Sequence, residues 1–136
     1  MRYIFKNLLY GLLVIVLVTL CELVITLPFG SPWDIYEPFE ISDEVYRHYL
    51  NIEFLLTAIP AGIVIFFILK FSKSSCTSAI KKGFLWTSML CFNYIFIGMG
   101  NNNFTIIFST FGIYILLLCS LLGTLFYIKL KAIVNE

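Results

Sequence analysis

Charged residues are scarce in this sequence, and their scarcity excludes a water-soluble globule. Asp, Glu, Lys and Arg make up 12% of the 136 residues, whereas apolar residues make up 60%. A soluble domain is usually about one quarter charged and about half apolar, so this chain has too little polar surface to face water on all sides. We therefore predict that lipid is its solvent and that residues 1–136 form one membrane domain.

Histidine is nearly absent, and phosphate-binding motifs are absent from the sequence. His48 is the only histidine, which excludes paired-histidine haem ligation and most zinc sites. There is no glycine-rich loop for phosphates or dinucleotides, and no nucleophile with a nearby base. The scattered lysines give no support for nucleic-acid binding. We expect no cofactor, no metal, no nucleic-acid partner and no enzymatic activity.

The four cysteines form no C-x-x-C pair. Cys21, Cys91 and Cys119 lie in apolar stretches, and Cys76 lies in a lysine-containing connector. We expect them to be small apolar residues that fill space rather than a disulfide or metal site.

Long apolar stretches are what the sequence does contain. A spanning helix needs about 20 mostly apolar residues, and residues 8–29, 52–69, 83–100 and 104–128 meet or approach this requirement. Helices satisfy their own backbone groups in lipid, and no strand alternation is present. We predict an all-α membrane protein, a bundle of four transmembrane helices whose last two form an antiparallel hairpin around residues 101–103.

Basic residues fall on one side of the membrane if the chain crosses it four times. They are Arg2, Lys6, Lys70, Lys73, Lys81, Lys82, Lys129 and Lys131, whereas Arg47 is the only basic residue on the acidic side. Because cytoplasmic loops carry an excess of lysine and arginine, we predict a multi-pass protein of the cell (inner) membrane with cytoplasmic N- and C-termini.

The outer loop, residues 30–51, contains two helix starts. Ser31 before Pro32 is one, and Ser42 before Asp43 and Glu44 is the other, from which a helix can continue into the second span. We predict a short amphipathic helix here. It either anchors the bundle at the headgroups or presents a negative recognition surface to a basic partner. The candidate recognition residues are Trp33, Asp34, Glu37, Glu40, Asp43 and Glu44.

Glu22 is the most informative single residue, because it lies roughly 10 Å inside the outer end of the first span. A charge at that depth is costly, so such a residue normally faces the bundle, pairs or stays protonated. Its candidate partners are Thr19, Thr26, Thr57, Asn93 and Tyr94. It is either a proton-coupling or ligand-binding carboxyl, or a hydrogen-bonding group that fastens two helices. Glu53 is expected to be solvated near the outer interface.

Small residues and one proline lie within the spans. Pro60 should kink the second span, and Ala58 with Gly62 forms a small-x-x-x-small pair that lets another helix come close. Ser120 and Thr124 provide a weaker pair on the fourth span.

Two stretches resemble the small immunity proteins that protect bacteria from pore-forming colicins. They are residues 2–12 (RYIFKNLLYGL), a basic and aromatic opening before the first span, and residues 58–62 (AIPAG) followed by Lys70. The resemblance implies an inner-membrane helical protein that binds the toxin's hydrophobic hairpin within the bilayer. Glu22, Asn93 and the acidic loop would then recognise this membrane-inserting partner.

Two other functions remain open. Four spans with a carboxyl in the first also resemble the small multidrug resistance transporters, which would make Glu22 a proton-coupling group. The chain could also be an accessory subunit of a larger complex, or form a homo-oligomer, since its later spans are apolar on all faces.

Overall fold

The computed structural model describes residues 2–28, 30 and 42–134. They form five helices and no strand within these described ranges: α1 (Arg2–Thr26), α3 (Asp43–Phe71), α4 (Cys76–Gly100), α5 (Phe104–Ser109) and α6 (Phe111–Val134). Four of them, all but α5, are long and apolar enough to cross a membrane. The predicted all-α bundle is confirmed. The predicted helix start at Ser31 lies outside the described residues.

Helix α3 begins at the predicted Ser42 start and runs on through the second apolar stretch. The Ser42 hydroxyl accepts a hydrogen bond from the Val45 N–H at 3.3 Å, and Asp43 and Glu44 occupy the first turn, where the helix dipole favours acidic groups. Pro60 lies inside this helix without ending it. The helix therefore starts nine residues before Ile52, where apolarity alone placed the span.

The fourth apolar stretch is not one helix. After the turn at residues 101–103, α5 forms, and Thr110 then adopts an extended conformation before α6 begins. The Thr110 hydroxyl donates to the Ile107 carbonyl at 2.7 Å, which competes with helical backbone bonding. From α3, the Asn51 side chain accepts a bond from the Gly112 N–H at 2.7 Å. A side chain of another helix thus satisfies one of the free N–H groups at the start of α6.

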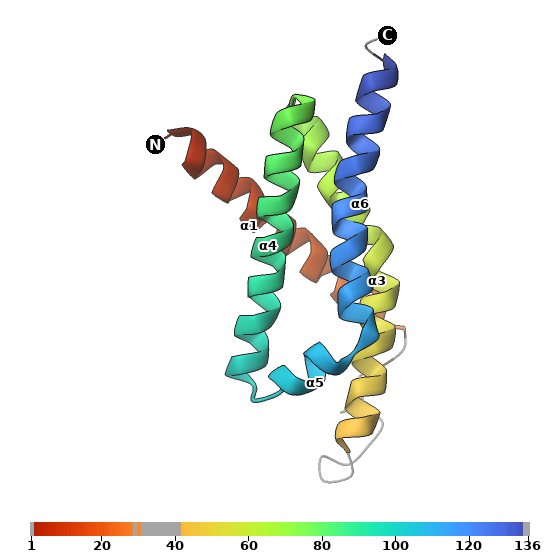
Figure 1. The fold of residues 1–136 in the computed structure, drawn as a ribbon. Helices are drawn as coiled ribbons and strands as arrows, with labels where there is room; N and C mark the ends of the chain where they lie inside the picture. The colour runs from red at the N-terminus through yellow and green to blue at the C-terminus, as the bar shows by residue number, and fades with distance from the viewer. Residues whose placement is uncertain (1, 29, 31–41, 135–136) are drawn as a thin grey trace.

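Helices α3 and α6 form the tightest pair, and they run in the same direction (Figure 1). Their backbones touch at Gly62 and Gly123. A Cβ added to Gly123 would lie only 2.1 Å from the Gly62 carbonyl oxygen. Gly62 and Ala58 are buried, as the small-residue pair predicted. Antiparallel α4 approaches α6 in a similar way, since a Cβ on Gly83 would lie 2.1 Å from the Thr124 hydroxyl oxygen.

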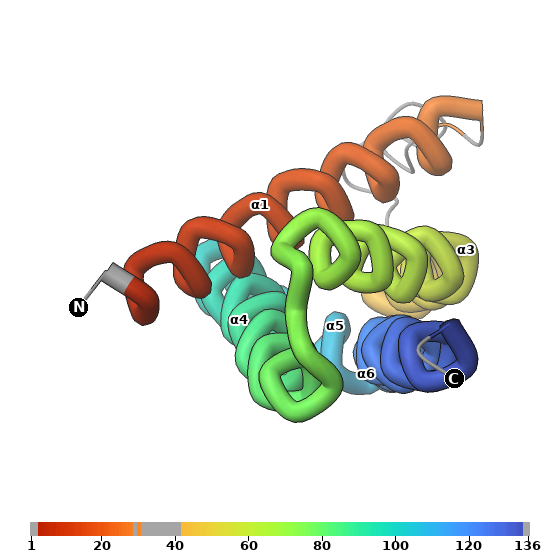
Figure 2. Tube along the Cα trace, turned by 90° about the horizontal axis from the view of Figure 1, so that it is seen from above, coloured from red at the N-terminus to blue at the C-terminus, as the bar shows by residue number. Residues whose placement is uncertain are grey.

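Helix α1 is an outer layer that crosses the bundle obliquely (Figure 2). It contacts α3 and α4 but not α6. Its buried seam consists of Asn7, Gly11, Val14, Val18 and the half-buried Glu22, which are spaced so that they share one helix face. Trp86 of α4 holds this seam, because its indole N–H donates to the Asn7 carbonyl at 2.9 Å.

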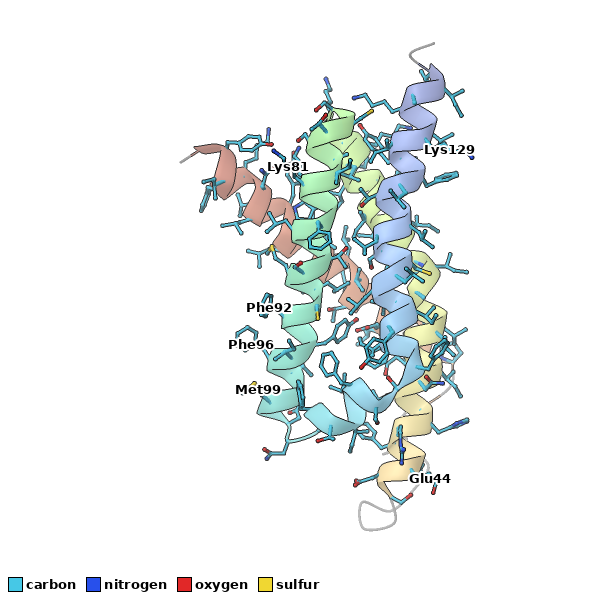
Figure 3. The ribbon with its side chains drawn as sticks, viewed as in Figure 1. Glu44, Lys81, Phe92, Phe96, Met99 and Lys129 are labelled. Atoms are coloured by element: carbon cyan, nitrogen blue, oxygen red, sulfur yellow. The ribbon has the colours of Figure 1, made fainter. Side chains whose placement is uncertain are left out.

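The helix order brings all the described lysines to one end of the bundle. The start of α1, the α3–α4 turn and the end of α6 lie there, and Figure 3 shows Lys81 and Lys129 at this end and Glu44 at the other. We call these the basic end (Lys6, Lys70, Lys73, Lys81, Lys82, Lys129, Lys131) and the acidic end (Asp43, Glu44).

We expect Gly123→Ala to lower the free energy of unfolding by about 1–3 kcal/mol, because the added methyl would overlap the Gly62 carbonyl and force α3 and α6 apart. Denaturation in mild detergent micelles measures the change. Gly100→Ala is the matched control, since a Cβ there meets nothing within 4 Å. Equal stability of the two variants would contradict the close α3–α6 contact.

Candidate functional site

The candidate site is built around the carboxyl of Glu22 on the inner face of α1. The Tyr94 hydroxyl of α4 donates a hydrogen bond to this carboxyl. Tyr94 is buried, and its ring packs edge-on against Phe54 of α3, with ring centroids 5.3 Å apart. The three side chains therefore join α1, α3 and α4.

Tyr94 is the one of the five candidate partners whose side chain bonds the Glu22 carboxyl. Thr57 is fully buried, but its hydroxyl donates to the Glu53 carbonyl of its own helix at 2.8 Å. Thr26 likewise bonds backbone carbonyls of α1, including that of Glu22 at 3.0 Å. Asn93 is half-buried and makes no side-chain hydrogen bond within the described residues. Thr19 is exposed.

Glu53 is half-buried on α3, which begins ten residues before it, about 15 Å away at helical rise. Its carboxyl interacts electrostatically with both Glu22 and Tyr94. We call Glu22, Glu53 and Tyr94 the carboxyl cluster. The sequence analysis expected a solvated Glu53 and did not group it with Glu22.

The carboxyl cluster carries two acids with no compensating cation. No ion pair to either glutamate is formed within residues 2–28 and 42–134. Carboxyls in such surroundings hold or share protons and bind hydrogen-bond donors. The described residues include no group of three or more potential metal ligands, and the four cysteines are free. The arrangement suits a polar contact between helices or with a partner's donor.

The outer-loop recognition residues are only partly described. Trp33, Asp34, Glu37 and Glu40 lie outside the described residues, whereas Asp43 and Glu44 are exposed at the acidic end. A polar groove of about 560 Å³ separates the start of α3 from the Asn turn, and its lining includes Ser42, Asp43, Tyr46 and residues 101–103.

The Asn turn contributes to this groove, which the sequence did not suggest. The Asn103 side-chain amide donates to the Tyr46 hydroxyl at 2.9 Å, so the turn is fixed against α3. Its amide oxygen is buried and has no hydrogen-bond partner among the described residues. The acidic end therefore presents amide groups beside Asp43.

A second polar cluster braces the basic end. The buried Lys82 donates to the Ser74 hydroxyl at 2.8 Å, and Tyr127 and Lys131 donate to the Ser74 carbonyl at 2.7 and 2.6 Å. These bonds fasten the α3–α4 turn to α6. The Ser72 and Ser74 hydroxyls provide acceptors for the Lys82 ammonium at 3.4 and 2.8 Å, which compensates for its burial.

Comparisons with protein-family models, curated proteins and solved structures found no match. Functional inference therefore depends on the residues themselves.

A double-mutant cycle tests the Glu22–Tyr94 bond. We expect Glu22→Ala and Tyr94→Phe to be coupled by about 0.6–1.7 kcal/mol, which runs from the average to the largest value found for hydrogen bonds between membrane helices. Unfolding free energies of the single and double variants in detergent give the coupling.

Tyr127→Phe is the control partner for Glu22→Ala. It also loses a hydroxyl hydrogen bond, but that bond is made to Ser74 at the basic end. Its effect should add to that of Glu22→Ala without coupling. Equal coupling in both cycles, or none in the first, would show that Glu22 and Tyr94 do not interact.

Proposed function

We propose that this membrane protein is non-enzymatic and binds a membrane-inserting protein in the outer half of the bilayer, as an immunity protein against a pore-forming bacteriocin. The observation that carries the proposal is the carboxyl cluster, a polar group inside the bundle in the half nearer the acidic end. Polar groups at membrane depth normally serve a structural or functional contact, because lipid offers them no hydrogen-bond partner.

Apolar side chains next to this half support binding within the bilayer. Phe92, Phe96 and Met99 of α4 are 59%, 73% and 66% exposed and point away from the bundle, as Figure 3 shows. Their spacing of four and three residues gives one continuous row. A hydrophobic hairpin can pack along such a row by the ridge-and-groove contacts that membrane helices use.

The acidic end supports a partner that arrives from outside. Asp43 and Glu44 are exposed at the start of α3, beside the groove formed with the Asn turn. A basic segment of a toxin would meet this negative surface before its hairpin enters the lipid. The resemblance of residues 2–12 and 58–62 to colicin immunity proteins agrees with this assignment.

Proton-coupled transport is the second candidate, and the electrostatic interaction between Glu22 and Glu53 is what favours it. Transporters use such carboxyls as proton carriers. The Tyr94 bond argues against transport, because it ties Glu22 to α4 and so gives the carboxyl a fastening role.

The orientation can be tested with two exposed turn residues. We expect Asn102→Cys to react with a membrane-impermeant maleimide in intact spheroplasts, and Lys73→Cys to react only after lysis, because the lysine-rich end should be cytoplasmic. The two sites are well matched, since both have positive φ (56° and 47°). Labelling of the unmodified chain gives the background from its own cysteines. The reverse pattern would overturn the proposed orientation.

Protection of sensitive bacteria tests the function. Cells that express the chain should survive at least one member of a panel of pore-forming bacteriocins that kills the parent strain. Asp43→Asn with Glu44→Gln should weaken protection by removing charge at the acidic end. Glu22→Gln should weaken protection partially rather than abolish it. Survival as a function of toxin dose measures each effect.

Lys81→Gln is the control, because it changes one charge at the basic end, and it should protect as well as the unchanged chain. Membrane levels of all variants are compared by immunoblot. No protection against any member of the panel would rule out the immunity assignment. Complete loss of proton-linked drug efflux on Glu22→Gln would favour the transporter.

A further inference from the structure

A groove runs between α3 and α6 on their lipid-facing side, away from the carboxyl cluster. It has a volume of about 670 Å³. Its floor includes Gly62 and Gly123, where the two backbones touch and side chains are absent. Its apolar walls include Ile59, Ile63 and Phe67 of α3, and Leu122, Leu125 and Phe126 of α6.

The length of this groove matches one leaflet. On α6 its lining runs from Cys119 to Lys129, which is about 15 Å at helical rise. On α3 it runs from Ile59 to Phe67, which is about 12 Å. Half of the roughly 30 Å hydrocarbon core of a bilayer is also about 15 Å. The groove is therefore long enough to hold an acyl chain across one leaflet.

A positive charge lies at one end of this groove. Lys129 is exposed and is the one charged residue in the lining. Lys70 is also exposed, and it follows Phe67 by three residues and Ile63 by seven, so it shares their face of α3. No acidic residue lines the groove, so neither lysine has a counter-ion from these walls.

We propose that the groove binds one acyl chain of an anionic phospholipid from the leaflet at the basic end, with the phosphate-bearing headgroup held by Lys129 and Lys70. The apolar walls hold the acyl chain, and the two lysine ammonium groups select a negatively charged headgroup. An anionic headgroup is favoured near a basic residue at the membrane surface, whereas a zwitterionic one carries its own cation. This inference does not rest on the immunity assignment.

A second copy of the chain fits the groove less well. Copies in one membrane have the same orientation, so docking on this face would bring the lysines of the two copies together. The lysines of the two copies would repel each other, and no acidic residue of the lining offsets this repulsion.

The full chain, purified in detergent, is titrated with phosphatidylglycerol or with phosphatidylcholine of the same acyl chains, and bound lipid is counted by native mass spectrometry. We expect one phosphatidylglycerol to bind preferentially. Lys129→Gln should weaken its binding about fivefold, corresponding to about 1 kcal/mol for one lysine near an anionic surface.

Lys81→Gln is the matched control for charge. It removes one lysine from the same end, but from α4, on the opposite side of α6 from Lys129 (Figure 3), and it should bind phosphatidylglycerol normally. Equal weakening by Lys129→Gln and Lys81→Gln would overturn the proposal, and so would equal binding of the two lipids by the unchanged chain.

Filling the groove tests the acyl-chain half of the proposal. Ile63→Trp should abolish the preferred lipid, because the larger ring occupies the chain's place, whereas Ile80→Trp on α4 should not. Both positions are exposed, at 49% and 55%, so neither variant disturbs the core, and circular dichroism checks the fold of each. A concentration-dependent dimer that Ile63→Trp disrupts and phosphatidylglycerol does not would overturn the proposal in favour of a second copy.

Discussion

The contact between the backbones of Gly62 and Gly123 determines how the rest of the bundle is arranged. Lipid gives helices little hydrophobic reason to associate, so close packing and hydrogen bonds between them must supply the attraction. At this contact α3 and α6 become one unit, to which α4 is joined through Gly83 and Thr124. Helix α1 packs on the outside of this unit, through Gly11 and Trp86. The lipid-facing groove is a direct result, because a contact without side chains leaves space between the flanking ones.

The sequence was sufficient for features that depend on neighbouring residues. Apolarity identified the four long helices, and Ser42 with its two acids identified the start of α3, because capping is a local interaction. The break at Thr110 could not be predicted in this way. Beside this break the Gly112 N–H at the start of α6 is bonded by Asn51, which precedes Gly112 by 61 positions. Its hydrogen bond exists only after the two helices have packed.

The candidate site was partly predictable for the same reason. Depth in the membrane identified Glu22, and its possible partners followed from their polarity. Which of them faces the carboxyl depends on the rotation of α4 about its axis, and this is set by the seam of α1 and by Phe54. Glu53 was missed because its interaction with Glu22 depends on how α1 packs against α3. The polar groove at the acidic end combines two segments that only the fold brings together.

The outer position of α1 has a consequence for biogenesis. Its carboxyl group enters the membrane 72 residues before the tyrosine that bonds it, and chain synthesis at roughly 5–20 residues per second makes that an interval of about 4–14 s. During this time α3 is synthesised, but α4, which carries the tyrosine, is still incomplete. The Glu22 carboxyl therefore lacks its tyrosine partner until α4, the third of the four long helices, has been made.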